Sequence, residues 1–207
     1  MFEEQLIEIG KRLYDKNLTV STSGNISLKT DKGIYITATG SQLGNLKKQD
    51  IVLVDFGGNE ISKGKASSEK KLHVEIYKRR KDVNAVIHVH SLYLTTFAAA
   101  HQTLDAPILS ENILYFEDIP LAPYYMPSTE DLAKETAKYL DKRDVALMSN
   151  HGAIAVAADL DKAFEKIETA EYYAHVCYNL GLLKKPKCLS KKDIDDLIQL
   201  KKSLLKK

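Results

Sequence analysis

The sequence predicts one α/β domain in which helices cover a largely antiparallel sheet. A chain of 207 residues is long enough to bury one substantial core. Segments with the two-residue period of strands occur in neighbouring pairs, and segments with the helical period lie between them. This interspersion of hairpins and helices favours a single sheet with helices packed against it.

The N-terminal third shows both periods. Residues 2–16 carry apolar side chains at steps of three and four, which predicts an amphipathic helix. Apolar segments at 25–28 and 34–37 flank a polar turn, which predicts a hairpin. A second hairpin is expected from 51–54 and 60–62, which flank a glycine-containing turn.

The middle of the chain alternates between the two element types. The expected elements are helix 70–80, strand 85–90, helix 91–101 and the extended segment 118–125. Another helix opens near residue 127, where Ser128 and Asp131 have the spacing of a capping box.

Two strands and two helices complete the domain. Strands are expected at 144–148 and 153–157. Asp159 can cap a long helix that Gly181 ends. We expect the domain to span residues 1–185, followed by a lysine-rich C-terminal helix or tail at residues 186–207.

The bulk composition limits the partners of the protein. The formal charge is only +2, from 30 basic and 28 acidic residues, so no global field attracts nucleic acid or a membrane. The N-terminus has two early glutamates and no continuous apolar run, which argues against a signal peptide. The two cysteines have no paired spacing, which indicates a reducing compartment. We therefore expect a cytoplasmic protein with no nucleic-acid or membrane partner.

The segment His88-Val-His90 is the strongest local feature. On a strand, side chains two residues apart point to the same face, roughly 7 Å apart along the strand. Both imidazoles can then reach one metal ion. The alternative is a hydrogen-bonded histidine pair at a sheet edge, and this motif alone does not decide between the two readings.

His151 strengthens the metal hypothesis. It lies between two predicted strands and precedes Gly152, which permits a tight turn that aims the imidazole into a cleft. Alone, it is better interpreted as a histidine in a turn. Together, the three histidines indicate three neutral nitrogen ligands around a divalent cation, zinc being favoured, with an open position typical of a catalytic site.

Several turns could bind an anion. Ser67 and Ser68 precede a predicted helix, whose first N–H groups favour an anion. Taken alone, plain helix capping is the better explanation of these serines, because capping serines are common. Glu69 in the same place could act as a base beside the metal. The glycine-containing turns 23–26 and 37–41 can offer N–H groups to a phosphate, although an ordinary turn is the better explanation for either one alone.

Five short motifs, taken in order, resemble those of the class II aldolase/adducin family. They are Gly24-Asn25, Thr39-Gly40, Ser67-Ser68-Glu69, His88-Val-His90 and Asn150-His151-Gly152. The resemblance covers about residues 4–180. It implies an α/β/α sandwich around a mainly antiparallel sheet, and a homotetramer with active sites where subunits meet.

The resemblance also implies roles for individual residues. His88, His90 and His151 would hold Zn²⁺, with Mn²⁺ or Co²⁺ as alternatives. Glu69 would be the acid/base residue and a fourth metal ligand when substrate is not bound. The remaining motif residues would surround the phosphate of a sugar substrate: Gly24, Asn25, Thr39, Gly40, Ser67 and Ser68.

The activity implied by the resemblance is that of a lyase of carbohydrate metabolism. It would cleave a ketose 1-phosphate, similar to L-fuculose 1-phosphate, to dihydroxyacetone phosphate and an aldehyde through a metal-stabilised enediolate. The family also contains sugar-phosphate 4-epimerases, dehydratases and non-catalytic adducin-like interaction domains. Glu69 favours the aldolase over the epimerase, whose equivalent residue is usually aspartate, and the histidine triad argues against an interaction domain.

One region departs from the aldolase pattern. In the family, a tyrosine from a neighbouring subunit donates the proton to the aldehyde oxygen. The matching position here holds Glu111, with Tyr115 nearby, and the C-terminal tail contains no tyrosine. The proton donor on the aldehyde side therefore stays open between these two positions.

Overall fold

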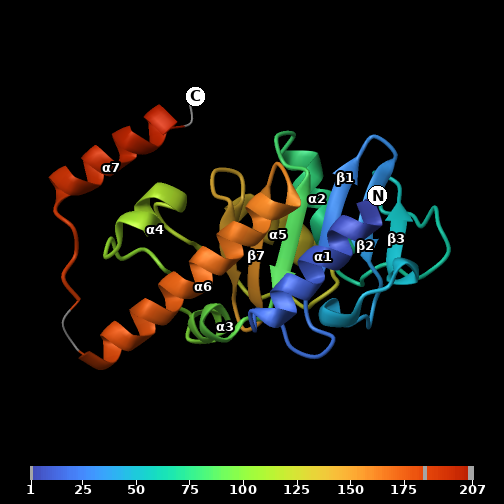
Figure 1. The fold of residues 1–207 in the computed structure, drawn as a ribbon, viewed down its shortest axis with the longest axis horizontal. Helices are drawn as coiled ribbons and strands as arrows, with labels where there is room; N and C mark the ends of the chain where they lie inside the picture. The colour runs from blue at the N-terminus through green and yellow to red at the C-terminus, as the bar shows by residue number, and fades with distance from the viewer. Residues whose placement is uncertain (1, 184–185, 205–207) are drawn as a thin grey trace.

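The structure, a computed structural model, describes residues 2–183 and 186–204 (Figure 1). Within this part, seven strands form one sheet in the order β3-β2-β1-β4-β7-β6-β5. Neighbouring strands are antiparallel except for β5 and β6, which are parallel. The strands are β1 (Asn25–Thr30), β2 (Gly33–Thr37), β3 (Ile51–Val54), β4 (Ala85–Val89), β5 (Leu121–Ala122), β6 (Val145–Met148) and β7 (Gly152–Ala157).

Helices cover both faces of this sheet. They are α1 (Phe2–Asp15), α2 (Lys70–Arg79), α3 (Leu92–Ala99), α4 (Ser110–Tyr115), α5 (Glu130–Tyr139), α6 (Leu160–Leu183) and α7 (Lys191–Leu204). Two separate buried clusters show that α1, α3 and α6 pack on one face, whereas α2 and α5 pack on the other. The predicted single α/β domain with a mainly antiparallel sheet is thus confirmed.

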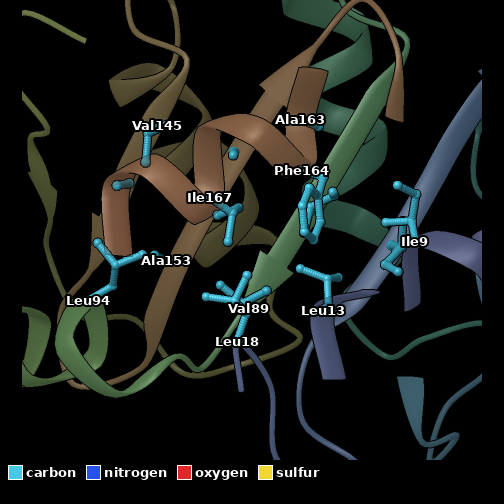
Figure 2. Close-up of a cluster of buried hydrophobic side chains, with 14 of the residues drawn as sticks. Ile9, Leu13, Leu18, Val89, Leu94, Val145, Ala153, Ala163, Phe164 and Ile167 are labelled. Atoms are coloured by element: carbon cyan, nitrogen blue, oxygen red, sulfur yellow. The ribbon is translucent and has the colours of Figure 1, made fainter. Parts of the chain in front are cut away.

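The two clusters together explain why the central strands are buried along their whole length. In the first cluster, Leu13 of α1 and Phe164 and Ile167 of α6 lie around Val89 of β4 (Figure 2). All described residues of β4 and β7 are buried, because helices cover both of their faces. Alternating residues of β4 belong to different clusters, and Val86 faces α2 and α5. His88 lies two residues further on and shares that face.

The second predicted hairpin is wrong in its second arm. Glu60 forms only an isolated bridge with Val54, and residues 60–62 are not a strand. The Leu53 N–H donates to the Ser62 hydroxyl at 2.8 Å, so a side chain takes the place of a backbone carbonyl in the ladder. The regular pairing stops there.

Two predicted helix boundaries also need correction. Thr129, not Ser128, caps α5, since its hydroxyl accepts from the Leu132 N–H. Gly181 does not end α6, which continues to Leu183. An exposed glycine in a last turn costs only about 1 kcal/mol relative to alanine, and the long buried face of α6 outweighs it. Asp159 does cap this helix, because its carboxylate accepts from the Lys162 N–H.

The mid-chain helix α4 and the C-terminal helix α7 lie apart from the sheet. The short helix α4 was not predicted, and α7 lies beside it (Figure 1). Lys201 of α7 pairs with Glu117 just after α4. The expected domain boundary at residue 185 lies outside the described residues. Among the helices that the structure describes, none is both long and apolar enough to cross a membrane.

Candidate metal centre and anion pocket

The strand order brings the predicted site residues to one edge of the sheet. β1 and β7 run antiparallel to β4, so their first residues lie beside the last residues of β4. In the register of these pairs, Asn25 is opposite His88 and Ala153 is opposite Val89. His151 precedes β7 and therefore lies next to the histidine pair that ends β4.

Two glycines allow the close approach of these segments. Gly24 has φ +82°, and a Cβ there would lie 2.7 Å from the His88 carbonyl oxygen. A Cβ on Gly152 would lie 2.4 Å from the Val89 carbonyl oxygen and 2.9 Å from His90 Cδ2. Any side chain at either position would displace the strand end that carries the imidazoles.

His88, His90 and His151 form a compact cluster, with possible ligand atoms all within 4.8 Å of one another. The His88 Nδ1–H donates to the Ala153 carbonyl at 2.9 Å, which leaves the Nε2 lone pair free to bind. His88 Nε2 lies 2.9 Å from His90 Nε2. The structure therefore brings together the three histidines that were selected as metal ligands, although their role as ligands stays a prediction.

Glu69 completes the cluster. Its Oε2 lies 3.2 Å from His88 Nε2, and its Oε1 lies 3.5 Å from His151 Nε2. A tetrahedral zinc site with bonds of about 2.0–2.1 Å has ligand–ligand edges of about 3.3 Å, so these separations suit one cation.

Unsatisfied atoms support this fit. Glu69 Oε1 is buried and has no hydrogen-bond partner within residues 2–183 and 186–204. A buried carboxylate oxygen without a partner is costly, and a cation among the three imidazoles would satisfy it. The donor set of three nitrogens and one oxygen is typical of zinc and suits related divalent cations.

The protonation states also favour metal binding. Burial, followed by repulsion from His88, lowers the pKa of His90 to about 3 and that of His151 to about 4. Both rings are therefore neutral near pH 7 and can offer lone pairs. Burial raises the pKa of Glu69, but His88, His151 and the hydrogen bond from Asn25 outweigh it, so the pKa lies below its ordinary value and the group is ionised.

A cavity of about 230 Å³ opens beside the cluster. All six residues predicted to bind phosphate line it, together with Glu69, His90 and His151. The turn after β2 meets the segment before α2, because Thr39 N–H donates to the Lys65 carbonyl and Ser67 N–H donates to the Thr37 carbonyl. This short backbone pairing brings the Thr39-Gly40 and Ser67-Ser68-Glu69 motifs together in one wall of the cavity.

The start of α2 serves the cavity and not only the helix. Glu69 is the N-cap residue, yet its carboxylate makes no cap hydrogen bond and faces the histidines instead. The Ser67 hydroxyl accepts from the Glu69 N–H at 3.3 Å, which is the N–H of the N-cap residue itself and not one of the first helical donors. The simple capping interpretation of Ser67 and Ser68 is therefore wrong, and both serines line the cavity instead.

Five further residues line the cavity: Thr22, Ser23, Ala38, Pro127 and Ser128. Ser23 and Ala38 lie in the two glycine-containing turns that the sequence indicated, whereas Thr22, Pro127 and Ser128 were not predicted as site residues. Pro127 and Ser128 come from the segment after β5, and β5 ends at this edge because it runs parallel to β6. Ser128 has φ +69°, a conformation that non-glycine residues seldom adopt outside functional sites and turns.

Glu111 and Tyr115 do not line this cavity. They lie on α4, which packs against α6 and α7. Within one chain, the structure thus offers neither of them as the proton donor on the aldehyde side.

Comparisons with known proteins agree with the geometry. Residues 4–178 match the family described as Class II Aldolase and Adducin N-terminal domain. The chain is 40% identical over 185 residues to L-fuculose phosphate aldolase of Methanocaldococcus jannaschii, covering 89% of this chain and 100% of that protein. It is 28% identical over 184 residues to 3-oxo-tetronate 4-phosphate decarboxylase of Haemophilus influenzae, covering 86% and 87%. A solved structure of L-fuculose 1-phosphate aldolase aligns with a TM-score of 0.90 at 30% identity, covering 97% of this chain and 96% of that one.

Proposed function

The chain belongs to the class II aldolase and adducin N-terminal domain family, and from this premise we propose that it cleaves a ketose 1-phosphate to dihydroxyacetone phosphate and an aldehyde. The substrate we favour is similar to L-fuculose 1-phosphate, because relatives that carry that name align over nearly the whole chain. The observation that carries the proposal is a cluster of three histidines and one carboxylate beside the cavity that the six predicted phosphate-binding residues line.

We assign the metal site to His88, His90 and His151, with Zn²⁺ as the preferred cation and Mn²⁺ or Co²⁺ as alternatives. When bound, the cation supplies Lewis-acid stabilisation of the charge that carbon–carbon cleavage leaves next to a carbonyl. His88 is oriented for this role by the Ala153 carbonyl. The neutral state of His90 and His151 keeps protons from competing with the cation near pH 7.

Glu69 is the proposed acid/base residue. It is ionised, buried and directed into the cavity, so it can accept a proton from a substrate hydroxyl and return one to the reacting carbon. It can also contact the cation when substrate is not bound, given its distances to His88 and His151.

The anion pocket holds the substrate phosphate in this proposal. The residues assigned to it are Gly24, Asn25, Thr39, Gly40, Ser67 and Ser68. Backbone N–H groups at two turns and at the start of α2 suit a dianion. A fixed phosphate places the reacting carbon beside Glu69, so the free energy of substrate binding is used to orient the reacting groups.

We further propose a cytoplasmic homotetramer with active sites between subunits. A neighbouring subunit would then supply the proton donor on the aldehyde side, which this chain does not place in its own cavity. Analytical ultracentrifugation tests the assembly, and a monomer with full turnover would contradict it.

The decisive experiment is a coupled assay for triose phosphate over a panel of ketose 1-phosphates. Metal-loaded protein is compared with chelator-treated protein and with chelated protein reloaded with Zn²⁺. We expect release of triose phosphate that chelation abolishes and Zn²⁺ restores. If the loaded protein released none from any member of the panel, the proposal would fail.

A second candidate is decarboxylation of a 3-oxo acid phosphate, favoured by similarity to the Haemophilus influenzae enzyme. This reaction also leaves a carbanion next to a carbonyl, so the same centre suits it. Epimerisation of a pentulose phosphate is the third outcome of the panel. Release of carbon dioxide would identify the decarboxylase, and an epimerised sugar phosphate without fragments would identify the epimerase.

A further inference from the structure

A chain of hydrogen bonds between buried side chains runs from Glu69 into the layer between β1 and α2. Asn25 Nδ2 donates to Glu69 Oε2 at 2.9 Å, and Asn25 Oδ1 lies 2.5 Å from His73 Nε2. His73 Nδ1 lies 2.6 Å from Ser27 Oγ, which lies 2.7 Å from the Tyr77 hydroxyl. All five side chains are buried.

The spacing in the sequence explains this alignment. Asn25 and Ser27 are two residues apart on β1 and therefore share a face. Glu69, His73 and Tyr77 follow at steps of four from the N-cap of α2 and therefore form one stripe of the helix. A polar stripe of the helix packs on a polar stripe of the strand.

The orientation of the Asn25 amide follows from its two partners. An ionised Glu69 carboxylate can only accept hydrogen bonds, so the Asn25 NH₂ group must face it. Asn25 Oδ1 then faces His73 and needs a donor, which places the His73 proton on Nε2. Reversal of the amide would set its oxygen against the carboxylate.

The far side of His73 is consistent with this tautomer. Burial lowers the pKa of His73 to about 3, so the ring is neutral and Nδ1 accepts from the Ser27 hydroxyl. Ser27 in turn accepts from the Tyr77 hydroxyl, whose pKa is raised by burial, so that it stays protonated. The Asn84 carbonyl, at 3.2 Å from that hydroxyl, is a longer alternative acceptor.

We propose that His73 is a positioning residue that fixes the amide of Asn25, and through it the carboxylate of Glu69, for substrate. It acts from outside the cavity, because Asn25 and Glu69 line the cavity and His73 does not. The inference rests on the proposed function, since Asn25 and Glu69 are assigned there to phosphate and proton transfer. Removal of the His73 N–H leaves the amide free to rotate and a buried Asn25 oxygen without a donor.

A double-mutant cycle tests the coupling. His73→Leu is made in the native chain and in Asn25→Ala, and kcat/KM for triose phosphate release is measured. We expect His73→Leu to lower kcat/KM about tenfold or more in the native chain but less than about twofold in the Asn25→Ala background. His73→Gln keeps an N–H donor for Asn25, so its kcat/KM should be close to that of the native chain. Equal losses in both backgrounds, or no loss, would overturn the proposal.

A control and two measurements without turnover complete the test. Thr136→Val removes another buried hydroxyl, in α5, and should leave kcat/KM unchanged. The same cycle on the dissociation constant of inorganic phosphate should show the same coupling, even if the protein proves not to be an aldolase. Nitrogen-15 NMR of the unmutated protein should show His73 protonated on Nε2, and a ring protonated on Nδ1 would refute the assigned chain.

Discussion

Glu69 meets two demands at one position, since one oxygen faces His151 and the other accepts from Asn25. Glu69→Gln keeps an oxygen that can face the cation but cannot take up a proton. We expect the metal content per chain to be unchanged while kcat falls about 10²- to 10⁴-fold, the usual share of a general acid/base. Metal analysis and turnover on the same sample check this.

The matched control for that substitution is Glu168→Gln, at a half-exposed position on α6 that pairs with Lys16. It should leave both metal content and turnover unchanged. If Glu69→Gln instead lost the metal together with the activity, Glu69 would be chiefly a metal ligand and not the proton carrier.

Thr136 illustrates the cost of a buried polar group without a function. It is fully buried in α5, and its hydroxyl has no hydrogen-bond partner in the described part of the chain. Valine has nearly the same shape and a similar helix propensity. Thr136→Val should therefore raise the free energy of unfolding by about 1 kcal/mol, measured by urea denaturation. A decrease would mean that the hydroxyl is satisfied in solution.

At the residue scale, the sequence predicted which side chains belong to the site better than it predicted which residues those side chains contact. The alternation of a strand was enough to place His88 and His90 on one face. No local period links residues 90 and 151, so the residue types alone gave only a hypothesis that His151 joins the pair, and the family resemblance strengthened it. The cavity position of Ser128 and the contacts of His73 could not be predicted, because they depend on which strand ends meet at one edge of the sheet.

At the element scale, a side chain of α6 binds the connection between β4 and the first turn of α3. The Glu171 carboxylate accepts from the N–H groups of Tyr93 and Leu94 and from the Ser91 hydroxyl, at 2.7–2.9 Å. α3 has no cap from its own N-cap side chain, so this carboxylate satisfies its first donors and interacts with its dipole. Ser91 follows His90, so the cap also holds one imidazole of the cluster.

Glu171→Ala should lower the free energy of unfolding by about 2 kcal/mol and weaken the binding of Zn²⁺. The matched control is Glu168→Ala, one turn earlier on α6, whose half-exposed ion pair should be worth less than about 1 kcal/mol. Urea denaturation and a metal titration compare the two variants. Equal effects at both positions would show that the Glu171 cap does not support the site.

Element prediction succeeded where a period extends over several turns or strand pairs, as in α1, α2 and the β1–β2 hairpin. It failed where one side chain alters the backbone pairing, as Ser62 does beside Leu53. It also missed α4, which spans only six residues and is too short to show a period. These failures lie away from His88, His90 and His151, so they do not affect the prediction that these three histidines are metal ligands.

At the scale of the whole molecule, the buried His73 and the partly buried His90 and His151 link acidity to stability. Burial is the largest cause of a lowered pKa at each of them, to about 3 for His73 and His90 and about 4 for His151. An unfolded chain has histidines with ordinary pKa values of about 6.5. Below that pH these histidines bind protons in the unfolded state but not in the folded state. The free energy of unfolding must therefore fall as the pH falls from about 6.5 towards 4.

His73 isolates one part of this effect, since it does not belong to the group of three histidines that could hold a metal ion. We compare the two proteins after chelator treatment. In acid, the unfolded native chain binds a proton at His73 that the folded chain does not bind, and His73→Gln removes this difference in bound protons. The loss of unfolding free energy between about pH 7 and pH 5 should therefore be smaller in the variant, by up to about 1 kcal/mol per pH unit below pH 6.5. Urea denaturation at several pH values measures both slopes. Parallel slopes would mean that His73 is protonated in the folded protein, although its full burial lowers its pKa to about 3.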